Sequence, residues 1–366
     1  MSSSQHAVVI DSGSYQIRVG LSGFAAPSVV CKSVVGRPKN DSCGRDVYFG
    51  EEAWVNRDHM CVTHPLQRGK VESWEDLELV WKNVFESSLK FSPREKPVLL
   101  SEATTSHHLQ RERMCRVMFE ALEVPALYLA SQSVLALLSS GNVSGCVLDS
   151  GYELTQAVPV YEGHCLPHAV HRLALGGHHV TTHLANLLKK SGSKFSNPAQ
   201  EYDAVTDIKE KMCFVSSDPS AGSEIVSDSE EARYSLPDGQ VLQIHSEKSQ
   251  APEILFSPET VSMETPGVPS LVVNSVSDSD TDLRPVLFGN VVLAGGCSLI
   301  PGFGVRLRKE VEALAPPGNM VRPVRRTDSA WVGGSLLASL SVFSDICISR
   351  AEYQETGPSI ILHKCF

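Results

Sequence analysis

The sequence VVIDSGS occupies residues 8–14, and a similar sequence, CVLDSGY, occupies residues 146–152. Each reads as an apolar strand that ends in Asp-Ser-Gly. A glycine after a strand lets the backbone turn tightly, so that successive N–H groups can point at a phosphate. Two such turns can clamp one polyphosphate, and their carboxylates, Asp11 and Asp149, can hold the waters of a Mg²⁺ ion. The repeat predicts a nucleotide site between duplicated lobes, whereas two ordinary hairpins are the simpler alternative.

A third glycine element, VVLAGGC at residues 291–297, again ends an apolar strand and runs into a helical pattern at 303–314. Bare backbone at Gly295 and Gly296 could face a flat ligand. A Gly-Gly pair alone is more often a tight turn, but here it completes a three-part nucleotide site.

Composition limits the class of protein. A chain of 366 residues exceeds a typical single domain, so two lobes are expected, and 42% hydrophobic with 20% charged residues is ordinary for a globular protein. The net charge of −10 has the wrong sign for direct binding of nucleic acid. We expect no membrane insertion, because no apolar run approaches the length of a spanning helix. The 10 cysteines include no Cys-x-x-Cys pair, which favours reduced thiols in the cytosol or nucleus.

Apolar β-branched runs alternate with helical patterns, which is typical of an α/β protein. An amphipathic helix is predicted after Ser73, with Ser73 and Asp76 in a capping arrangement. The pattern of residues 111–122 predicts a second helix, and that of residues 124–129 predicts a turn into a buried strand. The polar segments 216–231 and 274–282 are predicted to be solvated loops.

Seven short segments occur in the order in which a known family carries them. They are VGRP (35–38), PVLL (97–100), VPVYEG (158–163), DIKEK (207–211), LPDGQ (236–240), WVGGS (331–335) and GPSI with KCF (357–366). In these segments the chain resembles actin and the actin-related proteins across essentially its whole length. The resemblance implies an α/β fold of the actin-like ATPase type, shared with heat-shock ATPases and sugar kinases. Two related α/β lobes would close over ATP or ADP with Mg²⁺, with a hinge near the helix that holds Gln132.

The resemblance also implies four subdomains. Subdomain 1 would comprise residues 1–32, 65–139 and 329–366, and subdomain 2 residues 33–64, with a short polar loop at its tip. Subdomain 3 would comprise residues 140–175 and 262–328, and subdomain 4 residues 176–261.

The family's nucleotide-site residues map onto this sequence position by position. Asp11 and Asp149 match the residues that hold Mg²⁺ through water, and together with Gln132 they would form a weak catalytic set. The remaining positions expected to bind the cofactor are Ser12, Gly13, Ser14, Tyr15, Arg18, Ser150, Gly151, Tyr152, Glu153, Gly177, Lys209, Glu210, Gly295, Gly296 and Cys297.

Several of these positions depart from the family pattern. Arg18 replaces a phosphate-binding lysine and Gln156 a histidine that orients the attacking water. The other departures are Tyr15 for glycine, Tyr152-Glu153 for Asp-Gly, Ile300 for an aromatic residue and Thr327 for a basic one. Because Glu153 brings a carboxylate towards phosphate and Gln156 lacks an imidazole, turnover is expected to suffer more than binding.

Six histidines crowd residues 164–183, and His179 and His183 stand four apart, as on one helix face. A metal site is conceivable. Ordinary packing is the stronger interpretation, since no Cys or acidic partner is spaced alongside.

A groove that receives partner helices in actin maps near Leu138, Ser139, Gly141, His164, Leu337, Leu340 and Ile346. Its aliphatic wall is retained, although His164 replaces a tyrosine. The alternative is that these side chains only pack the junction between lobes.

Three hypotheses follow. The first is a structural, actin-like cytoskeletal protein that holds ATP or ADP with Mg²⁺, hydrolyses it slowly and assembles with other actin-like subunits or cytoskeletal partners. The second is a filament-forming ATPase like actin, and the third is a scaffold subunit of a nuclear chromatin complex or a motor-associated complex. The first predicts a cytoplasmic, cytoskeletal location, with the nucleus as the alternative. Within the family, the ending and the heavy substitution resemble the tissue-restricted actin-like proteins of male germ cells.

The expected filament contacts are weak. In actin a longer loop with an aliphatic tip inserts into the neighbouring subunit, whereas the matching residues 39–47 are short and polar here. The segment 260–264, which matches actin's cross-strand plug, is less apolar than the family pattern. We therefore expect poor autonomous filament formation.

Overall fold

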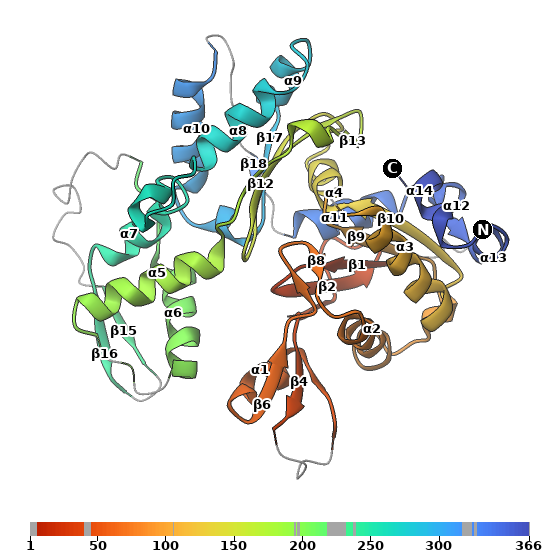
Figure 1. Cartoon of the computed structure of the whole chain (residues 1–366), viewed down its shortest axis with the longest axis horizontal. Helices are drawn as coiled ribbons and strands as arrows, with labels where there is room; N and C mark the ends of the chain where they lie inside the picture. Colours follow the sequence, from red (N-terminus) through yellow and green to blue (C-terminus); the bar gives the residue numbers. More distant parts are fainter. Residues whose placement is uncertain are drawn as a thin grey trace. The chain divides into compact units, whose positions relative to one another are not determined.

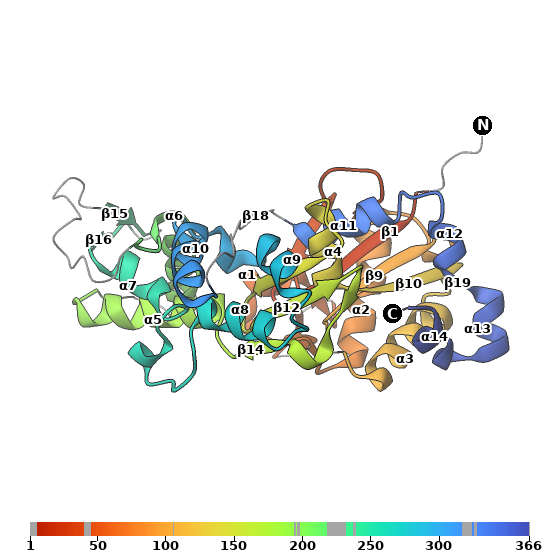
Figure 2. The same ribbon diagram turned by 90° about the horizontal axis from the view of Figure 1, so that it is seen from above.

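The computed structural model describes residues 6–39, 45–104, 106–193, 195, 198–217, 232–236, 239–316, 324–325 and 328–365. The chain divides into two compact units, of which unit 1 is Met1–Ser144, Val160–Pro167 and Asp328–Phe366. Unit 2 is Gly145–Pro159 and His168–Thr327. Figures 1 and 2 show the ribbon in two views. The first Asp-Ser-Gly sequence thus belongs to unit 1 and the second to unit 2, while the division into four subdomains stays a prediction.

Unit 1 is built on a six-stranded sheet with the order β19-β10-β9-β1-β2-β3. Strand β1 is parallel to β9, which is parallel to β10, and β1 forms an antiparallel hairpin with β2. The carboxyl ends of β1, β9 and β10 therefore meet at one edge. The strands are β1 (Val8–Ser12), β2 (Gln16–Leu21), β3 (Val29–Lys32), β9 (Val98–Glu102), β10 (Ala126–Ser131) and β19 (Ile348–Ser349).

Helices cover both faces of this sheet, which explains why its central strands are apolar at successive positions. Val8 and Ile10 pack into one cluster with residues of α2 (Trp74–Asn83) and α3 (His108–Arg116). Val9, on the other face, packs with residues of α4 (Gln132–Ser139) and α11 (Ser329–Leu337). Figure 2 shows α4 and α11 on one side of the sheet and α2 and α3 on the other.

The smaller elements of unit 1 complete it. Strands β4, β5 and β6 form a three-stranded sheet beside α1, and β7 pairs with β8. Their bounds are β4 (Val35–Pro38), β5 (Tyr48–Phe49), α1 (Gly50–Val55), β6 (Met60–Thr63), β7 (Leu66–Gln67) and β8 (Lys70–Val71). The carboxyl-terminal helices are α12 (Phe343–Ile346), α13 (Arg350–Thr356) and α14 (Ile361–Lys364).

The second sheet has the order β13-β12-β11-β17-β18, with β14 also paired to β12. As in unit 1, the strand that ends in Asp-Ser-Gly has a hairpin partner on one side and a parallel strand, β17, on the other. The strands are β11 (Gly145–Ser150), β12 (Thr155–Tyr161), β13 (His164–Cys165), β14 (His171–Leu173), β17 (Val291–Ala294) and β18 (Val324–Arg325).

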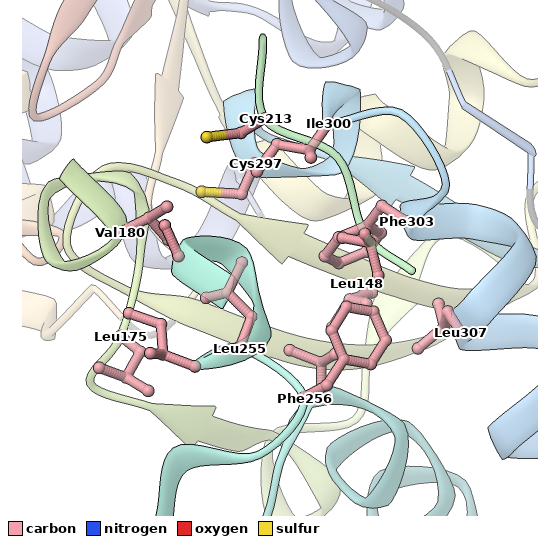
Figure 3. Packing of buried hydrophobic residues seen from close by; sticks show 14 of the residues in the cluster. Leu148, Leu175, Val180, Cys213, Leu255, Phe256, Cys297, Ile300, Phe303 and Leu307 are labelled. Atoms are coloured by element: carbon pink, nitrogen blue, oxygen red, sulfur yellow. The ribbon is translucent and has the colours of Figure 1, made fainter. Parts of the chain in front are cut away.

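The core of unit 2 joins this sheet to its helices. Leu148 of β11 lies among Phe256, Phe303 and Leu307 (Figure 3), and the rings of Phe256 and Phe303 meet edge to face with centroids 5.2 Å apart. The helices are α5 (Gly177–Lys190), α6 (Pro198–Met212), α7 (Glu247–Glu253), α8 (Val268–Ser277), α9 (Arg284–Gly289) and α10 (Phe303–Leu314), and a hairpin joins β15 (Ala232–Ser235) to β16 (Val241–Ile244).

Most of the expected elements are confirmed. Helix α2 starts after Ser73, whose Oγ accepts a hydrogen bond from the N–H of Asp76. Helix α3 starts at His108, three residues before the expected segment, and continues as a π-helical turn through Val117–Ala121 into strand β10. The helix expected at 303–314 is α10.

The prediction of a solvated loop at 274–282 is wrong for its first half. Residues 274–277 end helix α8, and Ser275 is fully buried. Its Oγ donates to the backbone oxygens of Ala157 and Ala169, so the polar side chain is satisfied inside unit 2. The other expected loop, 216–231, lies outside the described residues from 218 onward.

Two composition-based expectations concern the described residues. None of their helices is both long enough and apolar enough to span a bilayer. Their cysteines are free thiols, most of them buried.

Candidate functional site

The first Asp-Ser-Gly turn joins β1 to β2 and brings Asp11 to the carboxyl edge of the unit 1 sheet. Asp11 is 6% exposed, and its Oδ1 accepts hydrogen bonds from Ser101 Oγ at 2.6 Å and Gln132 Nε2 at 2.8 Å. Ser101 comes from β9 and Gln132 opens α4, so three segments far apart in sequence converge here. These two donors thus fix the orientation of the Asp11 carboxylate.

The backbone of this turn is also held. The N–H of Gly13 donates to the carbonyl of Gln16 at 3.0 Å, which closes the turn. Ser12 accepts at its Oγ from the Trp81 indole and at its carbonyl from Gln132 Nε2. The N–H of Gly13 is therefore engaged within the turn, and the expected contact of Gly13 with the cofactor stays a prediction.

Two replaced residues of the first turn contact other side chains. Tyr15 lies against Lys32, whose Nζ is 5.0 Å from the ring centroid and 3.4 Å from the hydroxyl. Arg18 stands opposite Asp11 in the β1–β2 register, but its Nε donates to Asp328 Oδ1 at 2.5 Å. Ser14 is half-buried in the turn.

The second Asp-Ser-Gly turn repeats the geometry of the first in unit 2. The N–H of Gly151 donates to the carbonyl of Leu154 at 2.9 Å, as that of Gly13 does to Gln16. Ser150 Oγ lies 2.8 Å from Thr155 Oγ1, which ties the two ends of the turn together. Asp149 precedes Ser150 at the end of β11 and lies beside Ala294 of β17 in the sheet.

The amino terminus of helix α5 holds this turn through backbone hydrogen bonds. The N–H groups of Gly177 and His178 donate to the carbonyls of Gly151 and Tyr152 at 2.9 and 2.8 Å. A Cβ on Gly176 would lie 2.6 Å from the Gly151 oxygen, so only glycine permits this approach. The amino-terminal N–H groups that would otherwise need partners are satisfied by the turn itself.

Lys209 and Cys297 donate hydrogen bonds to the same part of the structure, where the second turn meets the start of helix α5. Lys209 Nζ donates to the carbonyl of Gly177 at 3.3 Å, and Cys297 Sγ to that of Gly151 at 3.3 Å. Burial raises the pKa of the Cys297 thiol, so it is a neutral donor. The structure thus brings together Gly151, Gly177, Lys209 and Cys297, which the sequence had separated by up to 146 positions.

Tyr152 of the second turn belongs to a network of aromatic side chains. The hydroxyls of Tyr152 and Tyr202 are 2.6 Å apart, and His178 Nδ1 lies 3.4 and 3.2 Å from them. Burial lowers the pKa of His178, Lys209 lowers it further and Glu153 opposes both. The imidazole is therefore neutral near pH 7, and the network fixes the turn through neutral hydrogen bonds.

Glu153 supplies the test of whether these residues fit a cation-bound nucleotide. Its Oε2 is buried and has no hydrogen-bond partner among the described residues. A buried carboxylate oxygen without a donor is costly unless a proton or a cation reaches it. Carboxylate oxygen is the ligand type that Mg²⁺ selects, so the turn fits a hydrated divalent cation better than a bare phosphate.

The remaining expected residues differ in their surroundings. Glu210 and Gly296 are exposed, while Gln156 is 5% exposed within β12. Ile300 is 8% exposed and belongs to the core of unit 2, near Cys213 and Cys297 in Figure 3. Thr327 lies outside the described residues.

The residues expected to line the partner groove all belong to unit 1. Leu138, Leu337 and Ile346 pack partly buried against the cluster beneath α4 and α11. Gly141 and His164 are exposed, Leu340 is 54% exposed and Ser139 is buried. An aliphatic surface is therefore present, with Ser139 contributing to the interior instead.

Two of the crowded histidines make contacts of another kind. His179 Nδ1 accepts from the N–H of Gly176, and His171 Nε2 lies 2.7 Å from Asp278 Oδ2. Among the described residues, no group of three His, Cys, Asp or Glu side chains is arranged to hold a metal ion.

Sequence reasoning missed four participants. Ser101 and Trp81 hold the first turn, Tyr202 joins the second, and Asp328 pairs with Arg18. The position of Ser101 at the end of a strand parallel to β1 was a usable signal. Asp328 carries none, because it is 310 residues from its partner.

The family model described as Actin matches residues 2–366, which is essentially the whole length.

Proposed function

The chain belongs to the actin family and has its mixed α/β fold, and from that premise we propose that it binds ATP or ADP with Mg²⁺. We propose further that it acts as a structural protein that assembles with other actin-like subunits or cytoskeletal partners. Hydrolysis of the nucleotide would be slow, and the protein would work mainly through its nucleotide-stabilised shape.

The observation that carries the proposal is the environment of Asp11. Its buried carboxylate accepts from Ser101 and Gln132, which hold it at the carboxyl ends of the parallel strands β1, β9 and β10. The edge formed by the carboxyl ends of parallel strands is also where open α/β sheets bind their ligands. The second turn presents Asp149 in the same relation to its own sheet.

Each residue has a proposed part in binding. Asp11 and Asp149 would hold waters of the cation, and Glu153 would turn its unpartnered oxygen towards it. The bound Mg²⁺ would supply positive charge that offsets the negative charge of the phosphates. Lys209 and Glu210, on α6, would contact the nucleoside, and Gly295 and Gly296 would leave backbone open to it.

ATP hydrolysis in a filament, as in actin, is the second candidate. The hydrogen bond from Gln132 to Asp11 favours it, because a fixed amide beside the carboxylate can orient a water. Gln156 weighs against it, since an amide cannot accept and return a proton as an imidazole does. A scaffold role in a nuclear or motor-associated complex would use the same groove residues without turnover.

The proposed partners follow from unit 1. Leu340 and Val342 are 54% and 52% exposed beside the partly buried groove residues Leu337 and Ile346. An apolar helix of a cytoskeletal partner would cover these side chains. We propose a cytoplasmic, cytoskeletal location on the strength of family membership.

A binding assay tests the proposal. Purified protein is heated with and without ADP and Mg²⁺, and nucleotide released by denaturation is identified by chromatography. Ligand at a hundred times its dissociation constant should stabilise the fold by about 2.7 kcal/mol. Asp11→Asn should remove most of this stabilisation, whereas Asp58→Asn, an exposed residue of the same unit, should keep it. Absence of both a thermal shift and released nucleotide in the parent protein would sink the proposal.

A further inference from the structure

Arg18, on strand β2, is the basic residue opposite Asp11 of β1, and its charge is already matched. Its Nε donates to Asp328 Oδ1 at 2.5 Å, and a terminal nitrogen donates to Gln16 Oε1 at 3.2 Å. The side chains of Arg18 and Asp328 are 25% and 24% exposed, so the pair is only partly screened by water. The guanidinium is thus held by an acid from the far end of the chain.

Asp328 occupies an unfavourable backbone conformation. Its φ is 51°, in the left-handed region, which costs a residue with a Cβ about 1 kcal/mol. It also stands at the position that caps helix α11, but its side chain makes no capping hydrogen bond. Aspartate is among the best capping residues when its backbone is extended. The Asp328 side chain could therefore either cap helix α11 or pair with Arg18. In this conformation it only pairs with Arg18.

We propose that the Asp328 carboxylate occupies the phosphate position on Arg18, so that a phosphate-bearing ligand must displace it in order to bind. This inference rests on the proposed function, because it concerns the same nucleotide site. It makes Asp328 a residue that sets the affinity for phosphate without being part of the first turn.

When phosphate replaces the Asp328 carboxylate on Arg18, the interactions that the protein loses are offset by others. A guanidinium presents a planar fork of donors that fits phosphate oxygens at least as well as a carboxylate. A displaced Asp328 can take an extended backbone and cap the first turn of α11, which offsets part of the lost ion pair. While Asp328 stays in place, its negative charge repels an incoming phosphate. Removing that charge should therefore strengthen binding.

The main experiment measures affinities by calorimetry for the full-length protein. Asp328→Asn keeps the size of the side chain and tolerates the left-handed conformation. It should raise the affinity for ADP with Mg²⁺ about tenfold, while the affinity for adenosine, which lacks phosphate, should not change. Asp345→Asn, an exposed residue of the same unit, removes one negative charge elsewhere and should leave ADP affinity unaltered.

A double-mutant cycle separates displacement from general electrostatics. In an Arg18→Gln background, Asp328→Asn should no longer strengthen ADP binding. Equal strengthening with and without Arg18 would overturn the inference, as would equal strengthening for adenosine. If ADP binds the parent and Asp328→Asn alike, the inference alone fails. If no variant binds ADP, the proposed function fails with it.

A spectroscopic readout does not depend on affinity. The Arg18 Nε–H resonance is assigned by its loss in Arg18→Gln, and Asp328→Asn should shift it in the ligand-free protein. Saturating ADP with Mg²⁺ should shift it in the parent as the carboxylate is exchanged for phosphate. A resonance unchanged by saturating ligand would overturn the displacement.

Discussion

The packing of the second turn against strand β17 requires glycine at position 295. Its φ is 78°, and an added Cβ would lie 2.2 Å from the Ser150 oxygen and 2.6 Å from Asp149 Oδ1. The position thus needs both the backbone freedom and the absent side chain of glycine. It sets how closely β17 approaches the end of β11.

Gly295→Ala is expected to lower the free energy of unfolding by at least about 2 kcal/mol, because left-handed strain and a backbone collision combine. Gly296→Ala is the matched control. Its Cβ would meet no described residue within 4 Å and its φ is not positive, so its effect should stay within about 0.5 kcal/mol. Urea denaturation of both variants measures the difference, and equal midpoints would refute the collision.

In the ligand-free protein, the buried and unpartnered Oε2 of Glu153 lowers the free energy of unfolding. Glu153→Gln removes the charge, so the variant should be more stable without Mg²⁺ by about 1 kcal/mol and should gain less from added Mg²⁺ than the parent. Thermal melts in chelator and in Mg²⁺ check this. Glu259→Gln, an exposed change in the same unit, should leave the response to Mg²⁺ intact. An identical response in Glu153→Gln would show that the oxygen faces no cation.

At the scale of single residues, the sequence predicted the two turns but not the side chains that hydrogen-bond to them. Asp-Ser-Gly after an apolar run is a local pattern, and local patterns report the turn that their own residues form. The partners of Asp11 and Arg18 come from strands and helices dozens to hundreds of residues away. Only the assembled sheet order makes them neighbours.

Helices and strands were predictable where their pattern and their capping residues agreed. Helix α2 has Ser73 as its cap and buries Leu77 and Trp81 four residues apart. Helix α8 was missed at its end because Asn274 and Ser275 are polar. The burial of Ser275 depends on carbonyls of Ala157 and Ala169, which no pattern within α8 reveals.

The end of β9 gives an element-scale pH dependence. Glu102 closes this strand at 7% exposure and accepts from Arg111 of α3, which also donates to the carbonyl of Cys365. Burial raises the pKa of Glu102 from its ordinary 4.5 to about 7, although Arg111 opposes the rise. The folded state therefore holds this proton more tightly than the unfolded chain does.

The sign follows from that difference. The contribution of Glu102 to stability is complete below pH 4.5 and is lost as the pH rises towards 7, a change on the order of 3 kcal/mol. Glu102→Gln cannot ionise, so the free energy of unfolding of the parent minus that of the variant should fall between pH 5 and pH 8. Urea denaturation at each pH measures it. A difference that stays constant or rises would mean that pairing with Arg111 outweighs burial.

At the scale of the whole molecule, the repeat of one strand-and-turn design in both units was predictable because its sequences are alike. Strand β1 and strand β11 each have a hairpin neighbour on one side and a parallel strand on the other. The family resemblance is confirmed over residues 2–366. What composition and periodicity alone left open was the family, since many α/β proteins share them.

Filament formation is the property of the whole molecule that we expect the sequence departures to affect most. Residues 39–47 read KNDSCGRDV, of which 40–44 lie outside the described residues. On their flanks, Lys39 Nζ donates to the carbonyl of Asp58, and Arg45 pairs with Glu52 at 3.6 Å. In the segment 260–264, the apolar residues Val261 and Met263 pack against the core of unit 2. The exposed residues in the described parts of both segments are therefore polar.

We expect no filaments from the protein alone at micromolar concentration in Mg²⁺, KCl and ATP. Replacing an aliphatic loop tip by polar side chains removes roughly 2 to 3 kcal/mol from each longitudinal contact at about 25 cal/mol per Å² of apolar surface. Filament growth repeats that loss at every added subunit. The aliphatic groove residues remain, so incorporation beside other actin-like subunits is the expected mode of assembly. Sedimentation and negative-stain microscopy, alone and with an actin-like partner, measure both outcomes, and abundant long filaments from the protein alone would show that another surface compensates.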